Sequence, residues 1–334
     1  MRYLKLPHIT PGMVLARPIL GDNGRLMVRE GIAITENLLK RVNDMSLQGL
    51  YIQQRGFEDI IVEDVVSEEL RLKAYNALKS GDYANCVPIA GKIVYDMTHA
   101  ATINMDLLDI KSDKDYEYRH CISVAIFAVA IGMHMGLKED QLNQLCVAGL
   151  LHDIGKFDVK KRVLSTKSIY SDRQMDEMKK HPMYSFEALK GYPSISAVAR
   201  NAILFHHENL DGSGYYGATA DKLGIMPRIL RVADTYDALT TTRKHREAFS
   251  PRYAIDCLLE DAGKIYDKDV VRTFGLTFPI YPKGFTIQLV NGQQGVVVDN
   301  RQNNRRPLIR LLSGEEINLA SNPEYKDIKI EDIV

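Results

Sequence analysis

The segment VAGLLHDIGK, residues 147–156, decides the fold and the candidate site of this 334-residue chain. An apolar run leads directly into the polar pair His152 and Asp153, and Gly155 follows as a residue that commonly ends a helix. Neighbouring side chains on a helix point about 100° apart, so the imidazole can reach one metal ion while the carboxylate faces another. A His-Asp pair alone is a weak signal, and the surrounding sequence has to supply the other ligands.

Four further blocks carry the remaining candidate ligands. They read YRHCISVA around His120, KKHP at His181, FHHENLDGSGYY with His206 and His207, and RVADTYDALTTTR with Asp234. Two adjacent imidazoles after the apolar run AILF are costly to bury unless they are coordinated or hydrogen-bonded. An unpaired carboxylate on the apolar helix around Asp234 is equally expensive. Imidazole and carboxylate together suit iron, manganese or zinc, so we interpret the blocks as one site in which two metal ions share an aspartate.

Three regions of the chain differ in the spacing of their apolar residues. The first alternates short β-like runs with turns such as Asn23-Gly24 and contains one helix signal, with Thr35 as its N-cap. From Ser67 the apolar residues recur every three or four positions, as in amphipathic helices. The last region alternates with period two around Gly-containing turns. We therefore expect a mainly α chain with a small N-terminal α+β module (1–66), a helical domain (67–275) and a small C-terminal β appendage (276–334).

Composition excludes several classes of protein. Lys and Arg together number 43, as do Asp and Glu, so the formal net charge is zero and bulk attraction to nucleic acid or an acidic membrane is absent. The apolar stretch at residues 121–137 is shorter than a membrane span of about 20 residues and contains Gly132 and His134, which favours a buried core helix. Four scattered cysteines without a CxxC pattern indicate reduced thiols, and the N-terminus lacks a signal-peptide pattern. We expect a cytoplasmic protein with no nucleic-acid and no membrane partner.

The five blocks resemble, in order and spacing, the HD-GYP subgroup of the HD-domain metal phosphohydrolases. They run from residue 116 to residue 246. The resemblance implies an all-helical HD-type domain and a metal-dependent phosphodiesterase that hydrolyses the bacterial second messenger cyclic di-GMP to pGpG or GMP. It further implies a hydroxide that bridges two divalent metal ions, with iron or manganese as the expected metals.

The resemblance assigns roles position by position. Asp153 matches the bridging, catalytic carboxylate, and Lys156 matches the lysine that contacts the scissile phosphate. Tyr215 follows Gly214 in the block that corresponds to the Gly-Tyr-Pro motif, and it could stack on guanine, bind phosphate or simply cover the core. The implied metal ligands are His120, His152, Asp153, His181, His206, His207 and Asp234. The implied substrate-binding residues are Lys156, Asp211, Gly214, Tyr215, Arg243 and Arg246.

Two positions depart from the family pattern. Tyr216 replaces the proline of Gly-Tyr-Pro, and because proline fixes φ at about −65°, its loss predicts a looser loop without removing a metal ligand. Some family members bind a third metal through a glutamate four residues before the first histidine, and Tyr116 occupies that position here. Glu117 lies one residue closer and could face the same way on a helix, but two metals are favoured over three.

Two alternatives to a cyclic di-GMP phosphodiesterase stay open. Tyr216 keeps open a low-activity cyclic di-GMP sensor or interaction module, although such a module needs neither a bridging aspartate nor two metals. Arg243 and Arg246 favour a cyclic dinucleotide without fixing its bases, so an HD phosphohydrolase acting on another nucleotide is the second alternative. The sequence leaves open the oligomeric state, a homodimer or a signalling partner protein, and the roles of the two small modules.

Overall fold

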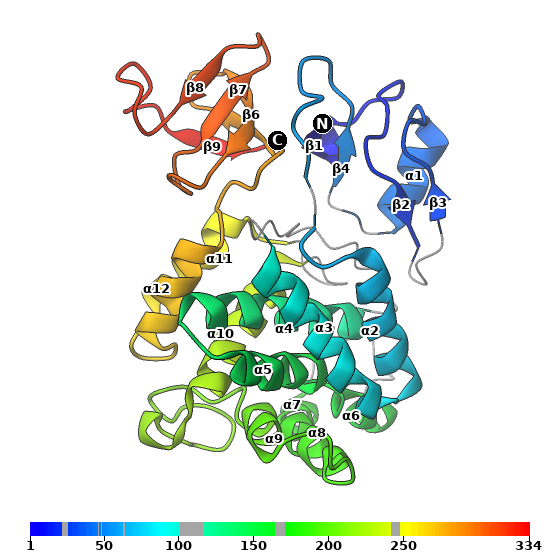
Figure 1. Ribbon diagram of the computed structural model, residues 1–334, viewed down its shortest axis with the longest axis vertical. Coiled ribbons are helices and arrows are strands. Elements are labelled where there is room, and N and C mark those ends of the chain that lie inside the picture. Colours follow the sequence, from blue (N-terminus) through cyan, green and yellow to red (C-terminus); the bar gives the residue numbers. More distant parts are fainter. Residues whose placement is uncertain are drawn as a thin grey trace.

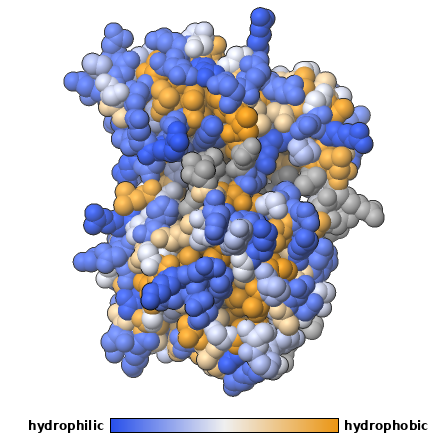
Figure 2. Space-filling view, viewed as in Figure 1, coloured by the Kyte–Doolittle hydropathy of each residue, from blue (hydrophilic) through white to orange (hydrophobic). Residues whose placement is uncertain are grey.

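The computed structural model describes residues 1–21, 26–45, 47, 49–62, 64–100, 116–163, 171–241 and 248–334. Figure 1 shows the helices from residue 68 onward gathered in one block, with two small β-containing modules beside each other at one end of it. Hydrophilic residues predominate on the rim of the face in Figure 2, while hydrophobic ones show mainly toward its middle. The predicted mainly α fold, with a small module at each end of the chain, is confirmed.

The N-terminal module pairs the first strand of the chain with the strand at residues 49–52. β1 and β4 are antiparallel, with Tyr3 opposite Tyr51, and β2 and β3 form a second antiparallel pair. Thr35 caps α1 as expected, because its side chain accepts a hydrogen bond from the Leu38 N–H at 3.2 Å. The predicted turn Asn23-Gly24 lies outside the described residues. The elements are β1 (Arg2–Lys5), η1 (Leu6–His8), β2 (Ile19–Leu20), β3 (Leu26–Val28), α1 (Glu36–Asp44) and β4 (Gly49–Ile52).

The helical block starts where the apolar spacing changes. Ser67 accepts a hydrogen bond from the Leu70 N–H at 3.3 Å and so caps the first helix of the block. Within the described ranges, none of the helices combines the length and the apolar character needed to cross a membrane. The elements are α2 (Glu68–Ser80), η2 (Tyr83–Asn85), α3 (Cys86–His99), α4 (Tyr116–His134), α5 (Glu139–Leu151), α6 (Lys156–Val163), α7 (Asp172–Met178), α8 (His181–Leu189), α9 (Ala197–Leu204), η3 (Ala220–Lys222), α10 (Ile225–Thr240), α11 (Pro251–Glu260) and α12 (Lys268–Thr277).

Helix α4 is the central element of this block. Its side chains are buried without a break from His120 to Gly132, and it packs against α5, α10, α12 and α2. The prediction that the apolar stretch is a core helix is therefore confirmed. A Cβ atom on Gly149 of α5 would lie only 2.5 Å from the Ala125 Cα of α4. The two backbones thus approach as closely as glycine allows, and this contact fixes the end of α5 that precedes His152.

The C-terminal appendage is a single antiparallel sheet with strand order β8-β7-β6-β5-β9. Both predicted hairpins are present, since β5 pairs with β6 and β7 pairs with β8. The last strand was not predicted, because its apolar residues Ile330 and Ile333 do not alternate with period two. The strands are β5 (Thr286–Leu289), β6 (Gln294–Asp299), β7 (Leu308–Leu311), β8 (Glu316–Asn318) and β9 (Ile330–Ile333).

The two small modules contact each other through β1 and the start of β5. The Tyr3 N–H donates to the Gly284 carbonyl at 2.7 Å, and the Thr286 hydroxyl donates to the Tyr3 carbonyl at 2.8 Å. The rings of Tyr3 and Phe285 stack at 4.6 Å. Tyr3 also belongs to the same continuous apolar core as the helices and the C-terminal sheet, so this core crosses the predicted boundary at residue 66.

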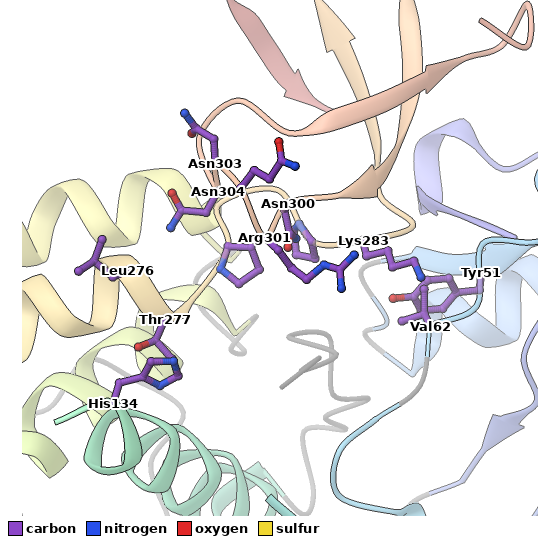
Figure 3. A pocket seen from close by; sticks show the side chains of 13 residues that line it. Tyr51, Val62, His134, Leu276, Thr277, Lys283, Asn300, Arg301, Asn303 and Asn304 are labelled. Carbon is purple, nitrogen blue, oxygen red and sulfur yellow. The ribbon is translucent and has the colours of Figure 1, made fainter. Parts of the chain in front are cut away.

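A cavity of about 530 Å³ lies where the C-terminal sheet meets the helical block and β4 (Figure 3). Two of the amides that line it are used in joining these parts. The Asn304 side chain donates to the Gly275 carbonyl at 2.6 Å, and the Asn300 side chain donates to the Tyr281 carbonyl at 3.1 Å. His134, the last residue of α4, lines the same cavity. None of the predicted metal ligands is among the described residues of its wall.

Candidate metal centre

Five helices of the block, and the turns that follow two of them, bring all seven predicted metal ligands together. His120 lies in α4, Asp234 in α10 and His181 at the first residue of α8, whereas the two adjacent pairs occupy the turns after α5 and α9. The ligand atoms fall into two groups, each within 4.8 Å: one contains His120, His152 and Asp153, and the other contains Asp153, His181, His206 and His207. Asp153 is the member that the two groups share.

The two carboxylate oxygens of Asp153 face different groups. Its Oδ2 lies 3.5 Å from Nε2 of His120 and 3.4 Å from Nε2 of His152. Its Oδ1 lies 3.1 Å from Nε2 of His181 and 3.8 Å from Nε2 of His206. A carboxylate in this position can bind one ion with each oxygen, which is the arrangement that a two-metal site requires.

Asp234 makes a second connection between the groups. Its Oδ1 lies 3.1 Å from Nε2 of His120, and its Oδ2 lies 3.7 Å from Nδ1 of His207. Asp234 and His120 are buried, and His207 is partly buried. The carboxylate of Asp234 on α10 therefore contacts one histidine of each ligand group.

Three of the histidines are oriented in the same way. His152, His181 and His206 each place Nδ1 against the backbone carbonyl three residues earlier. The acceptors are Gly149 at 2.8 Å, Met178 at 2.8 Å and Ile203 at 2.6 Å, respectively. A hydrogen bond to a carbonyl requires a proton on Nδ1, which leaves the lone pair of Nε2 directed at the centre. The local turns thus select the tautomer that binds metal.

Asp237 was not among the predicted site residues, yet it orients His120, the fourth histidine whose Nε2 faces the centre. Its Oδ2 lies 2.6 Å from Nδ1 of His120, and both side chains are buried. A carboxylate on the far nitrogen of a metal-binding imidazole fixes the ring and raises its basicity. The signal was present in the block RVADTYDALT, because Asp237 follows Asp234 by three residues and so lies on the same face of the helix.

The carboxylates are charged at neutral pH. Burial alone would raise the pKa of Asp153, but the adjacent His152 and Lys156 hold it well below its usual range. Burial likewise opposes ionisation of Asp234, but hydrogen bonding to His120 and the neighbouring His207 lower its pKa well below the usual range. The site therefore presents two buried anions to an incoming cation.

The imidazoles are mostly neutral. Burial, reinforced by neighbouring imidazoles, holds the pKa of His206 and of His207 well below the ordinary value. His152 differs: burial opposes its protonation, but the attraction of Asp153 and Cys121 raises its pKa well above the ordinary value. A metal ion bound at His152 would replace this proton, since metal ligation requires the neutral imidazole.

Two buried atoms test the fit of a metal. His152 Nε2 and Asp153 Oδ1 are inaccessible to water, and neither has a hydrogen-bond partner among the residues that the structure describes. Buried polar atoms without partners cost several kcal/mol in total. Both atoms face the centre, where a divalent cation would satisfy them, so the ligand set fits metal ions.

The turn after α5 is held against α8 by a serine and a glycine. The Ser185 hydroxyl donates to the His152 carbonyl at 2.7 Å and accepts the Gly155 N–H at 2.8 Å. A Cβ on Gly155 would lie 2.2 Å from the His181 carbonyl oxygen. We expected Gly155 to end the helix, but α5 ends at Leu151. Glycine is needed at position 155 because α8 approaches the turn so closely.

The loop of the block DGSGYY lies directly beside the centre. A Cβ on Gly214 would lie 2.5 Å from the Glu208 Cα, so only glycine allows the loop to approach the histidine turn. The Tyr215 ring packs on His207 at 4.5 Å between ring centres. The carboxylate of Asp211 is exposed and accepts the N–H of Ser213 at 3.0 Å and its hydroxyl at 2.6 Å. Asp211 therefore orders the turn of the loop from its outer side.

The remaining predicted residues lie around the ligands. Lys156 begins α6, its ammonium group donates to Asp153 Oδ2, and its side chain is 23% exposed. Tyr116, at the position of the third-metal glutamate, stacks its ring on His120 at 5.5 Å. Arg243 and Arg246 lie outside the described residues.

The model of the HD domain family matches residues 102–270, about half of the chain. The chain belongs to the HD domain family. The match covers all seven predicted ligands of the centre, and the HD-GYP resemblance drawn from the motifs is confirmed by relatives of this HD domain protein.

Curated relatives and a solved structure support this assignment. The cyclic di-GMP phosphodiesterase PA4108 of Pseudomonas aeruginosa is 28% identical over 219 residues, which cover 65% of this chain and 53% of the relative. A cyclic di-GMP phosphodiesterase of Vibrio cholerae is 34% identical over 131 residues, 37% of this chain and 27% of the relative. Bd1817 of Bdellovibrio bacteriovorus, an HDG"Y"P protein, shares the fold with a TM-score of 0.50 at 16% identity, covering 81% and 97% of the two chains. The chain spans about half the length of the curated relatives that it matches.

Proposed function

We propose that this HD domain protein is a metal-dependent phosphodiesterase that hydrolyses cyclic di-GMP to pGpG or GMP. The observation that carries the proposal is the position of Asp153, with one carboxylate oxygen toward each group of histidines. The names of the relatives support the choice of substrate, since PA4108 and the Vibrio cholerae protein are both cyclic di-GMP phosphodiesterases.

Two divalent ions are proposed for the centre. Imidazole and carboxylate ligands suit iron, manganese and zinc alike, and the preference for iron or manganese comes from the family resemblance. His120, His152 and Asp234 would hold one ion. His181, His206 and His207 would hold the other, and Asp153 would bind both. Such ions lower the pKa of bound water and polarise a phosphoryl oxygen. The protein's part is to hold the ligands in a buried ring whose orientation is set by backbone carbonyls and by Asp237.

Lys156 is proposed to bind the scissile phosphate. Its ammonium group rests on the carboxylate that faces both ligand groups, and part of its side chain reaches the surface. An arriving phosphate would offer the ammonium group a second anionic acceptor, and the proton on Nζ could then pass toward the leaving oxygen. Tyr215, which packs on His207, would border the same phosphate or a guanine base. Arg243 and Arg246 stay proposed substrate contacts from the resemblance.

A second cyclic dinucleotide is worth testing, because three further relatives, each 27–28% identical, are 3'3'-cGAMP-specific phosphodiesterases of Vibrio cholerae. The decisive experiment uses protein purified without oxygen. Elemental analysis should find about two equivalents of iron or manganese per chain. The same sample is then given cyclic di-GMP, 3'3'-cGAMP and linear pGpG in parallel, and the products are separated by chromatography.

We expect cyclic di-GMP to be cleaved with the highest kcat/KM of the three. Faster turnover of 3'3'-cGAMP would show that this dinucleotide is the preferred substrate, and the proposed phosphodiesterase reaction would still hold. Tight binding of cyclic di-GMP by the metal-loaded protein without any product would instead identify a sensor and overturn the proposed activity.

A further inference from the structure

Tyr216 makes three hydrogen bonds that its position in the motif does not suggest. Its backbone N–H donates to Glu208 Oε1 at 2.7 Å. Its hydroxyl donates to the Lys179 carbonyl at 3.2 Å and accepts the N–H of Met183 at 3.2 Å. The residue that replaces the family's proline therefore connects the loop to two other segments. The sequence predicted a looser loop at this point, and the structure provides a different means of holding it.

The hydroxyl of Tyr216 caps helix α8. The first N–H groups of a helix have no partner within the helix, and α8 has no side-chain cap from its own N-cap residue Lys180 among the described residues. Pro182 has no N–H to satisfy, which makes Met183 the next donor. Tyr216, 33 residues away in sequence, accepts this N–H. Because α8 begins with His181, the cap lies at the end of the helix that carries a predicted metal ligand.

The backbone of Tyr216 is held by a buried carboxylate. Glu208 is 3% exposed, and its two oxygens accept the N–H groups of Tyr216 and Ala218, each at 2.7 Å. A buried carboxylate requires such donors. Proline at position 216 has no N–H and could not make this bond, so the bond exists because the residue is not proline.

We propose that Tyr216 is a positioning residue for substrate binding, which fastens the loop bearing Tyr215 to the start of α8. The inference rests on the proposed function, because Tyr215 is taken to border the substrate. Tyr215 packs on His207 and lies 6.2 Å from the ring of His181. Loosening the loop would move this ring relative to the centre without removing a ligand. The effect should therefore appear in the binding of a large cyclic dinucleotide and not in metal content.

The test compares Tyr216→Phe with Tyr184→Phe. Tyr184 is a matched control, because it lies on the same helix and its hydroxyl donates to Glu177 of α7 at 2.7 Å. Tyr216→Phe removes both hydroxyl bonds and keeps the backbone bond to Glu208. Tyr216→Pro, the third variant, also removes the backbone bond. Each protein is measured for metal content, for amide hydrogen exchange in peptides covering residues 179–186 and 208–219, and for kcat and KM.

We expect Tyr216→Phe to speed exchange at Met183 and, through the loss of the two hydroxyl bonds, to raise KM for cyclic di-GMP about fivefold. Metal content and the hydrolysis of bis(p-nitrophenyl) phosphate, a small diester that does not need the loop, should stay within about twofold of the wild type. Tyr216→Pro should raise KM at least as much, and Tyr184→Phe should change neither measurement.

Unchanged exchange at Met183 together with unchanged KM in Tyr216→Phe would overturn the inference, as would an equal effect of Tyr184→Phe. Amide exchange is measured without substrate. It therefore tests the connection between Tyr216 and the start of α8 even if cyclic di-GMP is not the substrate. A protein that shows the exchange effect but no turnover of any dinucleotide would refute the proposed function while keeping the loop connection. A loss of metal in Tyr216→Phe would assign the residue to the metal centre and also overturn the inference.

Discussion

The two ends of helix α4 each carry a histidine, and their surroundings differ completely. His120 and His134 are 14 residues apart, which is about 21 Å along a helix. His120 is buried and lies against the carboxylates of Asp153, Asp234 and Asp237. His134 is exposed and its Nδ1 contacts the Ala130 carbonyl. The cavity that it lines (Figure 3) has no carboxylate among the described residues of its wall. A histidine of α4 is therefore a candidate metal ligand only where neighbouring elements place acidic side chains against it.

The largest effect should come from removing the carboxylate that both ligand groups share. Asp153→Ala should lose most of the bound metal, and its kcat should fall at least about 10³-fold. The surroundings of His120 would then support no more catalysis than those of His134. Metal content and product formation are measured together, with circular dichroism to show that helical content is kept. His134→Ala is the matched control and should behave as the wild type. Undiminished turnover in Asp153→Ala would disprove the bridging assignment.

A lysine near each end of α4 offers a second test of the difference between these ends. Lys156→Met removes the ammonium group beside Asp153 and should lower kcat about 10²-fold with metal retained, as for the loss of one charged donor. Lys283→Met makes the same change at the cavity near His134 and should leave kcat unchanged. Equal losses in the two variants would show that the lysine effect is not specific to the centre.

Asp237→Asn tests the orientation of His120. The amide keeps the size of the side chain but removes the charge that holds the imidazole, so the metal Kd should rise about 10- to 100-fold. The measurement is metal retention against a chelator of known affinity. Asp299→Asn, at the last residue of β6 in the C-terminal sheet, is the control with the same chemical change. Unchanged retention in Asp237→Asn would mean that packing alone positions the ring.

The smallest effect is expected at the cavity itself. Asn304→Ala removes the bonds to the Gly275 and Phe278 carbonyls at the end of α12. The free energy of unfolding should fall by about 1 kcal/mol, measured by urea denaturation, while kcat/KM stays at the wild-type value. A fall in activity larger than the fall in stability would show that this end of the molecule communicates with the metal centre.

The sequence predicted the elements and ligands whose signals are local. The caps Thr35 and Ser67, the core helix around residue 125 and the C-terminal hairpins follow from spacing over a few residues. The seven ligands follow from motifs, and the structure brings them together. Their roles as ligands, and the module boundaries at residues 66 and 275, stay predictions.

What the sequence missed depends on contacts between distant segments. Ser185 joins the turn after α5 only because α8 lies against it, and Gly155 is required by that approach and not by the end of a helix. Glu208 serves a loop eight to ten residues further on. Asp237 meets His120 from 117 residues away. Spacing indicates that Asp237 shares a helix face with Asp234, but the partner that each of these residues meets depends on how the helices pack.

The close contact between Gly149 and Ala125 has a mechanical consequence. No side chain separates the two backbones there, so α4 and α5 have no compressible layer between them and must move as one rigid body. His120, His152 and Asp153 therefore keep fixed positions relative to one another. A second close approach, at Gly155, and the Ser185 hydroxyl hold α8 against the turn after α5. The loop around Tyr216, in contrast, is connected to the start of α8 by single hydrogen bonds, which open at a smaller free-energy cost than a packed pair of helices. We therefore expect a large ligand to displace this loop before it moves either helix.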